Sequence, residues 1–397
     1  MSKAANSIYS MKLRHLTYSS AFLILTVFFI TSPAVALNLT AMGDNDYGKL
    51  GDGTTTMRDT PVMIATDVIK ADAGFHHSLF IKNDNTLWGM GNNLRGQLGD
   101  GTTTDRLTPV LIATNVAQAA AGDGISMFVK NDDTLWRMGC NYTTEVNDST
   151  KSPAQLATDV IQVAVGYSYA LFIKTDNTLW KMDLIDPLQI GHADNVQIAI
   201  DVAQVAISHY PDVHYSVFIK NDGTLWFLGR LMYIVKDPHD ADKDRYYFFN
   251  ADSPLQIATD VFQVAAGYRH LLFIKNDGTL WAMGNNCNGE LGDGTHDPHT
   301  TPIKVATNVT RVAAGCNNSF FIKTDNTLWA MGVIANGDMV ETEYKKPVQI
   351  GNDFYGIDAG LSHTLFLQSP TASYFVPDNT EDNDNGGGGC FIATAAY

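Results

Sequence analysis

The segment NDGTLWAMGNN, residues 276–286, is the clearest copy of a pattern that recurs through this 397-residue chain. Its central Asp-x-Thr-Leu-Trp accounts for all six tryptophans: Trp88, Trp136, Trp180, Trp226, Trp281 and Trp329. Successive tryptophans are separated by 48, 44, 46, 55 and 48 residues. A repeat period of this length is typical of propellers or solenoids.

Each repeat carries the pattern of about four short strands. Around Trp281, an apolar alternation at residues 261–267 and an apolar run at 270–275 lead into Asn-Asp-Gly-Thr. Gly and Asn tolerate the positive φ of tight turns, so this sequence predicts a hairpin. The strand containing Trp281 and another at residues 301–306 complete the unit. Four short strands every ~45 residues predict a propeller blade.

The two ends of the chain each carry half a repeat. The front half and the back half of the pattern each occur seven times, but the chain begins with a back half, Leu37–Gly43, and ends with a front half, Tyr355–Gln368. We therefore predict an all-β chain folded as a seven-bladed β-propeller whose last blade pairs these two segments, which removes exposed sheet edges. Thr40 stands where other units have Trp, so we expect this blade to be atypical and less tightly packed.

Two motifs carry a family resemblance. They are GNNLRGQLGDGT at residues 91–102, with relatives at 43–54 and 284–295, and Ala-Gly-x-x-His ending at His77, His270 and His363. Over about residues 37–368 the chain resembles the regulator of chromosome condensation repeat family. The resemblance implies a seven-bladed propeller that binds proteins through its loop faces. Family activities include guanine-nucleotide exchange on a nuclear GTPase, chromatin docking, light sensing and, in exported bacterial relatives, inhibition of β-lactamases.

Charge and the N-terminal segment separate this chain from the nuclear relatives. The formal charge is −16, and residues 1–36 hold three basic residues and no acid, so the remainder sits at −16 − 3 = −19. Such acidity argues against nucleic acid and anionic lipid as partners, and hence against exchange and chromatin docking. The negative charge has two interpretations: it keeps the protein soluble, or it attracts a basic partner. No exchange-loop residue can be carried over.

Residues 1–36 have the layout of a secretory signal. Basic Lys12 and Arg14 precede an apolar run, Ala21–Ile30, and a small-x-small cleavage site, Ala34–Ala36. We expect cleavage before Leu37 and an exported bacterial protein in the periplasm, at the cell surface or secreted; an uncleaved anchor is the alternative. Contact with the membrane is expected only through this signal or the C-terminal tail.

The sequence offers no catalytic motif, metal set or cofactor fingerprint, and we assign none. His77, His270 and His363 could form a ring of imidazoles, but their repetition favours a hydrogen bond within each blade. The repeated Trp favours packing over sugar or peptide binding. The Gly-Asp-Gly-Thr segments are expected to form tight turns in which Asp and Thr cap backbone amides.

Two irregular segments depart from the repeat. Residues 230–249 replace a glycine-rich loop with aromatic, basic and acidic residues, and residues 208–215 lengthen the preceding front half. Such a mixture is typical of interface hot spots, whereas drift of tolerated surface loops is the alternative. The predicted contact residues are His209, Tyr210, His214, Tyr215, Arg230, Tyr233, Arg245, Tyr246, Tyr247 and Phe248.

Beyond the repeats the composition changes. Residues 369–389 form an acidic and glycine-rich linker, and Cys390–Tyr397 resembles the start of the CFI-box module at the ends of exported bacterial proteins. Cys390 is a candidate for tail processing or attachment; a disordered end is the alternative. Cys287 and Cys316 could form a disulfide, which spacing alone does not decide.

Together these features predict a monomeric, exported interaction module that binds a protein partner of unknown identity. One alternative is a hydrolase or lyase with carboxylates and histidines converging at the channel mouth. Another is a structural or adhesion component of the cell surface.

Overall fold

The structure, a computed structural model, describes residues 37–140, 150–184, 195–208, 214–235, 245–335 and 341–375, all of which belong to one compact unit. Within these ranges there is no α-helix, and the only helical turn is the 3-10 helix η1, Asp46–Gly48. No helix of the described residues has the length and apolar character needed to cross a membrane.

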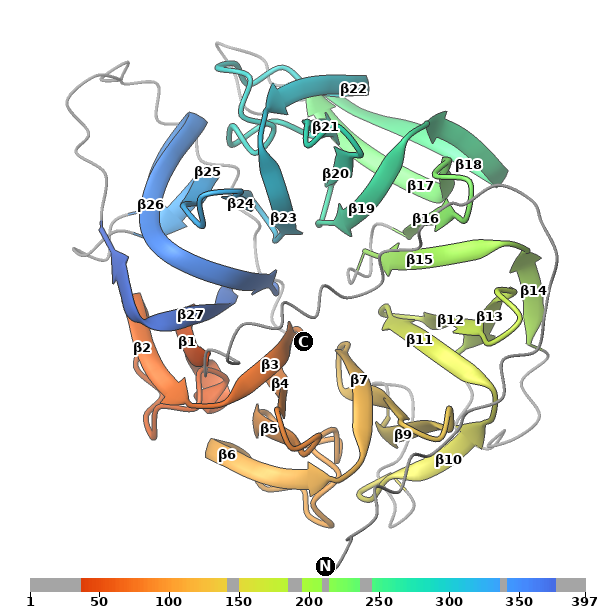
Figure 1. The fold of residues 1–397 in the computed structure, drawn as a ribbon, viewed down its shortest axis with the longest axis vertical. Helices are drawn as coiled ribbons and strands as arrows, with labels where there is room; N and C mark the ends of the chain where they lie inside the picture. The colour runs from red at the N-terminus through yellow and green to blue at the C-terminus, as the bar shows by residue number, and fades with distance from the viewer. Residues whose placement is uncertain are drawn as a thin grey trace, which may run out of the picture. The chain divides into compact units, whose positions relative to one another are not determined.

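The strands form a ring of seven blades, each with four strands from the centre to the rim (Figure 1). The innermost strands are β3 (Val68–Ala73), β7 (Val116–Ala121), β11 (Val160–Val165), β15 (Val202–Ile207), β19 (Val261–Ala266), β23 (Val309–Ala314) and the second part of β26 (Glu341–Ala359). The second strands are β4 (His77–Lys82), β8 (Ile125–Lys130), β12 (Tyr169–Lys174), β16 (Tyr215–Lys220), β20 (His270–Lys275), β24 (Asn318–Lys323) and β27 (His363–Tyr374).

The third and outer strands complete the blades. The third strands are β5 (Leu87–Gly91), β9 (Leu135–Gly139), β13 (Leu179–Asp183), β17 (Leu225–Val235), β21 (Leu280–Gly284), β25 (Leu328–Ala335) and β1 (Asn38–Gly43). The outer strands are β6 (Arg106–Ala113), β10 (Ala154–Ala157), β14 (Val196–Ala199), β18 (Arg245–Ala258), β22 (His299–Ala306), the first part of β26 and β2 (Arg58–Ala65). We number the blades 1 to 6 from β3 onward and call the last the closing blade.

The predicted ring closure is confirmed. Blades 1 to 5 are separate four-stranded sheets, whereas β26 passes from the rim of blade 6 to the centre of the closing blade and joins both into one seven-stranded sheet. In the closing blade β1 pairs antiparallel with β27, from Asn38 opposite Gln368 to Gly43 opposite His363. Strand β27 continues to Tyr374, six residues past the boundary expected from the sequence, because Tyr374 and Ser373 pair with Gly351 and Asn352.

The repeated tryptophan packs against the blade in the same way in each unit. Trp281 lies opposite Phe273 with ring centroids 6.4 Å apart, and the Lys275 ammonium lies over the indole, 5.0 Å from its centroid. Its indole N–H donates to Thr279, whose hydroxyl donates to Asp277. The motif therefore satisfies its own hydrogen bonds at the end of a hairpin, and its indole packs against Phe273 and Lys275. These contacts support the packing interpretation.

The closing blade replaces this arrangement with a smaller polar pair. Thr40 lies opposite Phe366 where the other blades have Trp, and Gln368 stands where they have Lys. The Thr40 hydroxyl donates to the Gln368 side-chain carbonyl at 3.2 Å. The blade is atypical as predicted, but Thr40 is buried, so its site is closed over by neighbouring residues.

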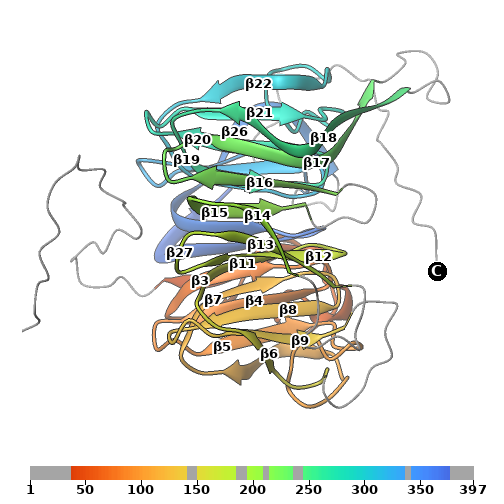
Figure 2. The same ribbon diagram turned by 90° about the vertical axis from the view of Figure 1, so that its right-hand side faces the viewer.

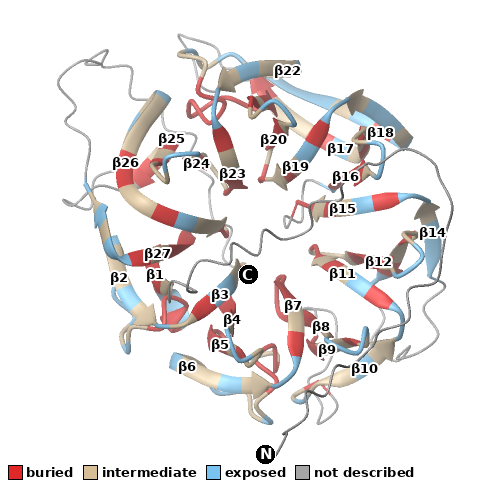
Figure 3. Cartoon of the chain, in the orientation of Figure 1, coloured by how far each residue is buried: buried red, intermediate tan, exposed pale blue. Residues whose placement is uncertain are grey.

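Buried residues lie between neighbouring blades rather than within single sheets. One cluster joins Val217 and Phe227 of blade 4 to Leu271 and Phe273 of blade 5. Figure 3 shows the buried stretches along the inner strands and an exposed rim that includes most of β18. Neighbouring blades therefore share their cores, and the ring stabilises each of its sheets.

Candidate functional site

The three repeated histidines join blades rather than lie exposed in the channel. His77, His270 and His363 are fully or almost fully buried, and their Nε2 atoms lie 2.7, 2.8 and 2.8 Å from the hydroxyls of Ser126, Ser319 and Ser78 in the following blade. The prediction of a structural role holds, but the hydrogen bond crosses between blades and is not confined to one. The sequence could not show this, because the partner lies in the next repeat.

Each of these serines also hydrogen-bonds to a glycine-rich loop. The Ser78, Ser126 and Ser319 hydroxyls donate to the backbone carbonyls of Lys49, Gln97 and Glu290. A hydroxyl has one proton, so the histidine Nε2–H must be the donor to the serine. Only the blades with a glycine-rich loop carry these histidines. Histidine, serine and loop therefore form one structural set, which excludes the histidines as free catalytic bases.

The glycine-rich loops are closed by buried asparagines. Asn286 is fully buried; its amide donates to Asp293 and Thr295, and its carbonyl accepts from the Leu291 amide. Asp293 in turn accepts from the Thr295 backbone, as predicted for Gly-Asp-Gly-Thr. Among the described residues no group of His, Cys, Asp and Glu has the arrangement of a metal site.

The cysteines of the ring are engaged in local contacts. The Cys287 sulfur lies 3.3 Å from the Asn285 side-chain carbonyl, and the Cys316 sulfur lies 3.5 Å from that of Asn317. Cys287 and Cys316 are not joined by a disulfide. Cys390, like residues 1–36 and 376–397 as a whole, lies outside the described residues.

The irregular segment at residues 230–249 forms a two-stranded ribbon. Strands β17 and β18 pair from Arg230 opposite Asn250 to Val235 opposite Arg245, beyond the last residue of β17 that pairs with β16, Gly229. Figure 2 shows this ribbon projecting from one face of the ring. The segment that replaces the glycine-rich loop therefore extends two β-strands at the edge of blade 4. Residues 236–244 lie outside the described ranges.

The ribbon is anchored on one side only. The Ile234 amide donates to the side-chain carbonyl of Asn285 in blade 5 at 2.9 Å, and the Arg230 amide donates to the His214 carbonyl at 2.8 Å. The second contact also brings the two irregular segments together, as the sequence suggested. In contrast, among the described residues β18 pairs only with β17 along this stretch, which makes it the edge strand of its sheet.

Aromatic and basic side chains cover both faces of the ribbon. Tyr246, Tyr247 and Phe248 are 60%, 40% and 38% exposed, and Arg230, Arg245 and His214 are also exposed. The Tyr233 and Tyr247 rings stack at 5.5 Å, and the Arg230 guanidinium lies 3.4 Å from the centroid of Phe248. These contacts hold the side chains in place before any partner binds.

One of the predicted contact residues, Tyr215, is not part of this surface. Tyr215 is fully buried, and its hydroxyl lies within hydrogen-bond distance of the Gly267 and His270 carbonyls in blade 5. It takes the structural position that histidine has in blades 1 and 5, which removes it from the exposed set. His209 and Tyr210 lie outside the described residues.

A cavity at the inner strands is lined by two carboxylates, those of Asp72 and Asp358. Each accepts a backbone amide of the next blade: Ala121 N for Asp72 at 2.7 Å and Ala73 N for Asp358 at 2.6 Å. Among the described residues lining this cavity there is no histidine, so the acid and base set expected of the enzyme alternative is not assembled there.

Comparison with known sequences agrees with this architecture. A family model of the regulator of chromosome condensation (RCC1) repeat matches residues 84–129 and 277–322, and a second model of the same repeat matches residues 68–97 and 263–290. Together the two models match residues 68–129 and 263–322 of this chain. No curated protein matches it.

Several solved structures are similar to this chain in fold. Prp20p from Saccharomyces cerevisiae superposes with a TM-score of 0.69 at 17% identity, covering 86% of this chain and 93% of that one. Human WBSCR16 gives a TM-score of 0.66 at 18% identity, covering 84% and 99%. Yeast RCC1 (Prp20) bound to Kap60 gives 0.68 at 17%, covering 84% and 89%. At these identities the likeness concerns the fold alone.

Proposed function

We propose that this chain is an exported interaction module that binds a protein partner through the ribbon of β17 and β18. The observation that carries the proposal is the set of exposed Tyr246, Tyr247 and Phe248 with Arg230 and Arg245 on one projecting ribbon. Tyr and Arg are enriched among the residues that dominate binding energy in protein interfaces. A ring of packed blades needs none of these side chains for its own core.

The geometry of the ribbon lowers the cost of binding. Ordering a free side chain at an interface costs about 0.5–1.5 kcal/mol. The stacked Tyr233 and Tyr247 and the paired Arg230 and Phe248 are already ordered by their contacts with one another. No strand of the described part of the chain pairs with the outer edge of β18, so an extended partner segment can bind there by strand addition.

Relatives of the same fold support a binding role. The structure of Prp20p is described together with its binding properties to Gsp1p and histones, and yeast RCC1 (Prp20) is seen bound to Kap60. For this acidic chain we propose a different partner that offers aromatic or acidic contacts to the two ribbon arginines. Guanine-nucleotide exchange has no supporting residue here.

Affinity capture tests the proposal, with extracts of the cell envelope and of the secreted fraction as the source of partner. A Tyr246→Ser, Phe248→Ser variant changes exposed side chains only and is expected to retain the stability of the ring while losing the captured protein. The matched control is Phe262→Ser, which removes an aromatic that is 45% exposed on β19, away from the ribbon. Equal capture by both variants and the unchanged chain would contradict the proposed surface.

Export and the tail are tested separately. We propose cleavage of residues 1–36, for which N-terminal sequencing of the protein from native cells is expected to begin at Leu37. We also propose that Cys390 is a site of tail processing or attachment. Mass spectrometry that finds an intact tail with an unmodified Cys390 would refute that role.

A further inference from the structure

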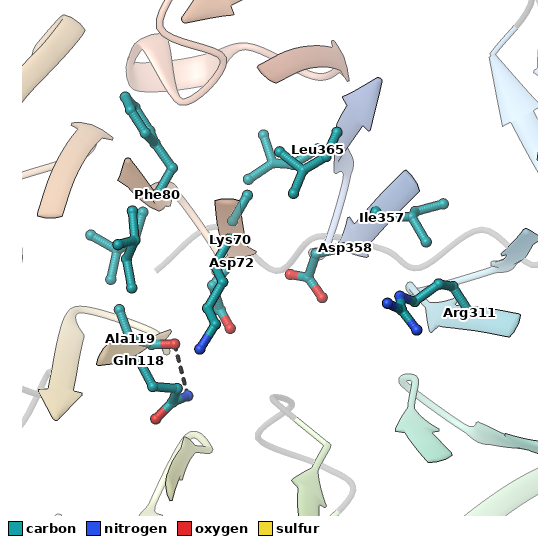
Figure 4. Close-up of a pocket in the computed structure, with 14 residues that line it drawn as sticks. Lys70, Asp72, Phe80, Gln118, Ala119, Arg311, Ile357, Asp358 and Leu365 are labelled. Atoms are coloured by element: carbon teal, nitrogen blue, oxygen red, sulfur yellow. Dashed lines mark hydrogen bonds between the residues drawn. The ribbon is translucent and has the colours of Figure 1, made fainter. Parts of the chain in front are cut away.

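A cavity of about 240 Å³ lies among the inner strands β3, β7, β23 and β26. Its apolar side is formed by residues of the second strands β4 and β27, including Phe80 and Leu365, and its polar side by Lys70, Asp358 and Arg311 together with Asp72 and Gln118 (Figure 4). The cavity is separate from the ribbon, which belongs to the third and outer strands of blade 4.

The charged side chains are departures from the repeat. At the third position of the innermost strand four blades carry glutamine, whereas blade 1 has Lys70, blade 6 has Arg311 and the closing blade has Gly356. At the fifth position five blades carry alanine, whereas blade 1 has Asp72 and the closing blade has Asp358. All the departures fall on three consecutive blades, so the ring is differentiated at one place.

Gly356 leaves the space between the two cations open. It is the one position of this set without a side chain, between the blades that carry Lys70 and Arg311. A Cβ atom here would lie 2.9 Å from Leu367 Cδ1, so a larger residue would have to displace the Leu367 side chain. The same residue that fits the strand thereby leaves room for a ligand.

The four charged groups do not neutralise one another. The Lys70 ammonium donates to the Ala117 carbonyl at 2.7 Å, and the Arg311 guanidinium donates to the Thr310 carbonyl at 3.2 Å. Each carboxylate accepts a backbone amide from the next blade, as described above. Among the described residues no ion pair joins either cation to either carboxylate, although all four line one cavity.

Desolvation disfavours the charged forms of three of these groups, Lys70, Asp72 and Asp358. Desolvation lowers the pKa of Lys70, raises the pKa of Asp358 to about 6 and, with the nearby Asp358 charge, raises the pKa of Asp72 further above its ordinary range. A ligand that brings opposite charges to both kinds of group would offset this cost. An anion alone would face the two carboxylates, and a cation alone would face Lys70 and Arg311.

We propose that this cavity binds a small zwitterion of the amino-acid type. The ammonium of the ligand is accepted by Asp358 and Asp72, and its carboxylate is bound by Arg311 and Lys70. Figure 4 shows Lys70 and Arg311 on opposite sides of Asp358, an arrangement that offers both signs of charge to one small molecule. A bidentate guanidinium contact fits a carboxylate in particular.

Isothermal titration of the full chain at neutral pH tests the charge requirement. The probes are glycine, γ-aminobutyrate and 6-aminohexanoate, which place ammonium and carboxylate at increasing separation, with acetate and methylammonium as single-charge controls. We expect at least one amino acid to bind, and to bind at least about tenfold more tightly than either control, since a hydrogen bond to a charged group contributes about 1.5–3 kcal/mol. Equal binding of acetate, or no binding of any amino acid, would overturn the proposal.

Variants that import residues from other blades locate the site. Arg311→Gln and Asp358→Ala introduce side chains that other blades carry at these positions, so both are expected to fold, which thermal unfolding checks. Each should weaken amino-acid binding about tenfold or more. Gln204→Ala, at the corresponding third position of blade 4, should leave binding unchanged. Unaltered affinity in both Arg311→Gln and Asp358→Ala would place the ligand elsewhere and refute the assignment.

Discussion

Replacing His270 by asparagine tests the contact between blades 5 and 6. His270 is fully buried, and its imidazole lies 2.8 Å from the Ser319 hydroxyl. Blade 6 carries Asn318 at the same position, so the replacement has a precedent in the ring. At neutral pH we expect His270→Asn to lower the free energy of unfolding by about 1–3 kcal/mol, because the Ser319 contact is lost.

The size of this effect should depend on pH. Desolvation lowers the pKa of His270 from 6.5 to about 4. Between these values the unfolded chain binds a proton that the folded chain does not, so acid destabilises the folded state. Of the roughly 3 kcal/mol that the full interval represents, about 2.5 kcal/mol should be lost from the unchanged protein between about pH 7 and about pH 4.5. His270→Asn lacks this loss.

Urea unfolding followed by tryptophan fluorescence at both pH values measures the difference. The buried His363, Asp72 and Asp358 titrate in both proteins and cancel in the comparison. We expect the free energy of unfolding of the unchanged protein, minus that of the variant, to fall by about 2.5 kcal/mol on acidification, so the variant becomes the more stable protein wherever the difference at neutral pH is smaller than this. The exposed His214→Asn variant serves as the control for replacing a histidine outside the blade junction. A gap independent of pH would refute the assignment of His270 as a neutral link between blades.

Three further predictions concern stability. Asp44→Ala leaves the ammonium of the fully buried Lys49 without its carboxylate and should lower the free energy of unfolding by about 3–5 kcal/mol. The double variant Asp44→Asn, Lys49→Gln copies the hydrogen-bonded Asn92–Gln97 pair of blade 1. In urea unfolding its stability should stay within about 1 kcal/mol of that of the unchanged protein. Asn286→Ala should cost about 2–4 kcal/mol and open residues 284–295 to limited proteolysis; a resistant loop would contradict the role given to Asn286. Trp281→Leu should lower the free energy of unfolding by about 2–4 kcal/mol, and an unaltered value would argue against packing as the role of the repeated Trp.

The propeller could be predicted because its determinants are local and repeated. The hairpin turns follow from residues that accept positive φ, such as Gly278 and Asn326, and the strands follow from alternation. The half repeats at Leu37–Gly43 and Tyr355–Gln368 could close the ring only by pairing with each other, and their register is now seen in β1 and β27. The sequence also showed that Thr40 replaces the repeated Trp in the closing blade, but it did not show that Thr40 hydrogen-bonds to Gln368.

The candidate sites could be predicted only in part. The sequence located the irregular segment and its exposed Tyr246, Tyr247 and Phe248, because an insertion in a regular repeat stands out. The sequence could not distinguish these exposed residues from Tyr215, which also belongs to an irregular segment. The Tyr215 hydroxyl, however, donates to the Gly267 carbonyl at the junction with blade 5. The charged residues of the inner strands were not predicted as a site, because nothing local in the sequence shows that Lys70, Asp72, Arg311 and Asp358 line one cavity.

The sequence by itself determined the repeat, the strands and the way the ring closes, since these depend on short-range preferences that recur in every unit. The tertiary structure decided what each departure from the repeat does. The curvature of the ring brings consecutive blades together. His77 therefore hydrogen-bonds to Ser126 of the next blade, and Arg311 lines the same cavity as Asp358. Contacts of that kind join residues about one repeat apart and depend on how neighbouring sheets pack, which no local pattern of residues records.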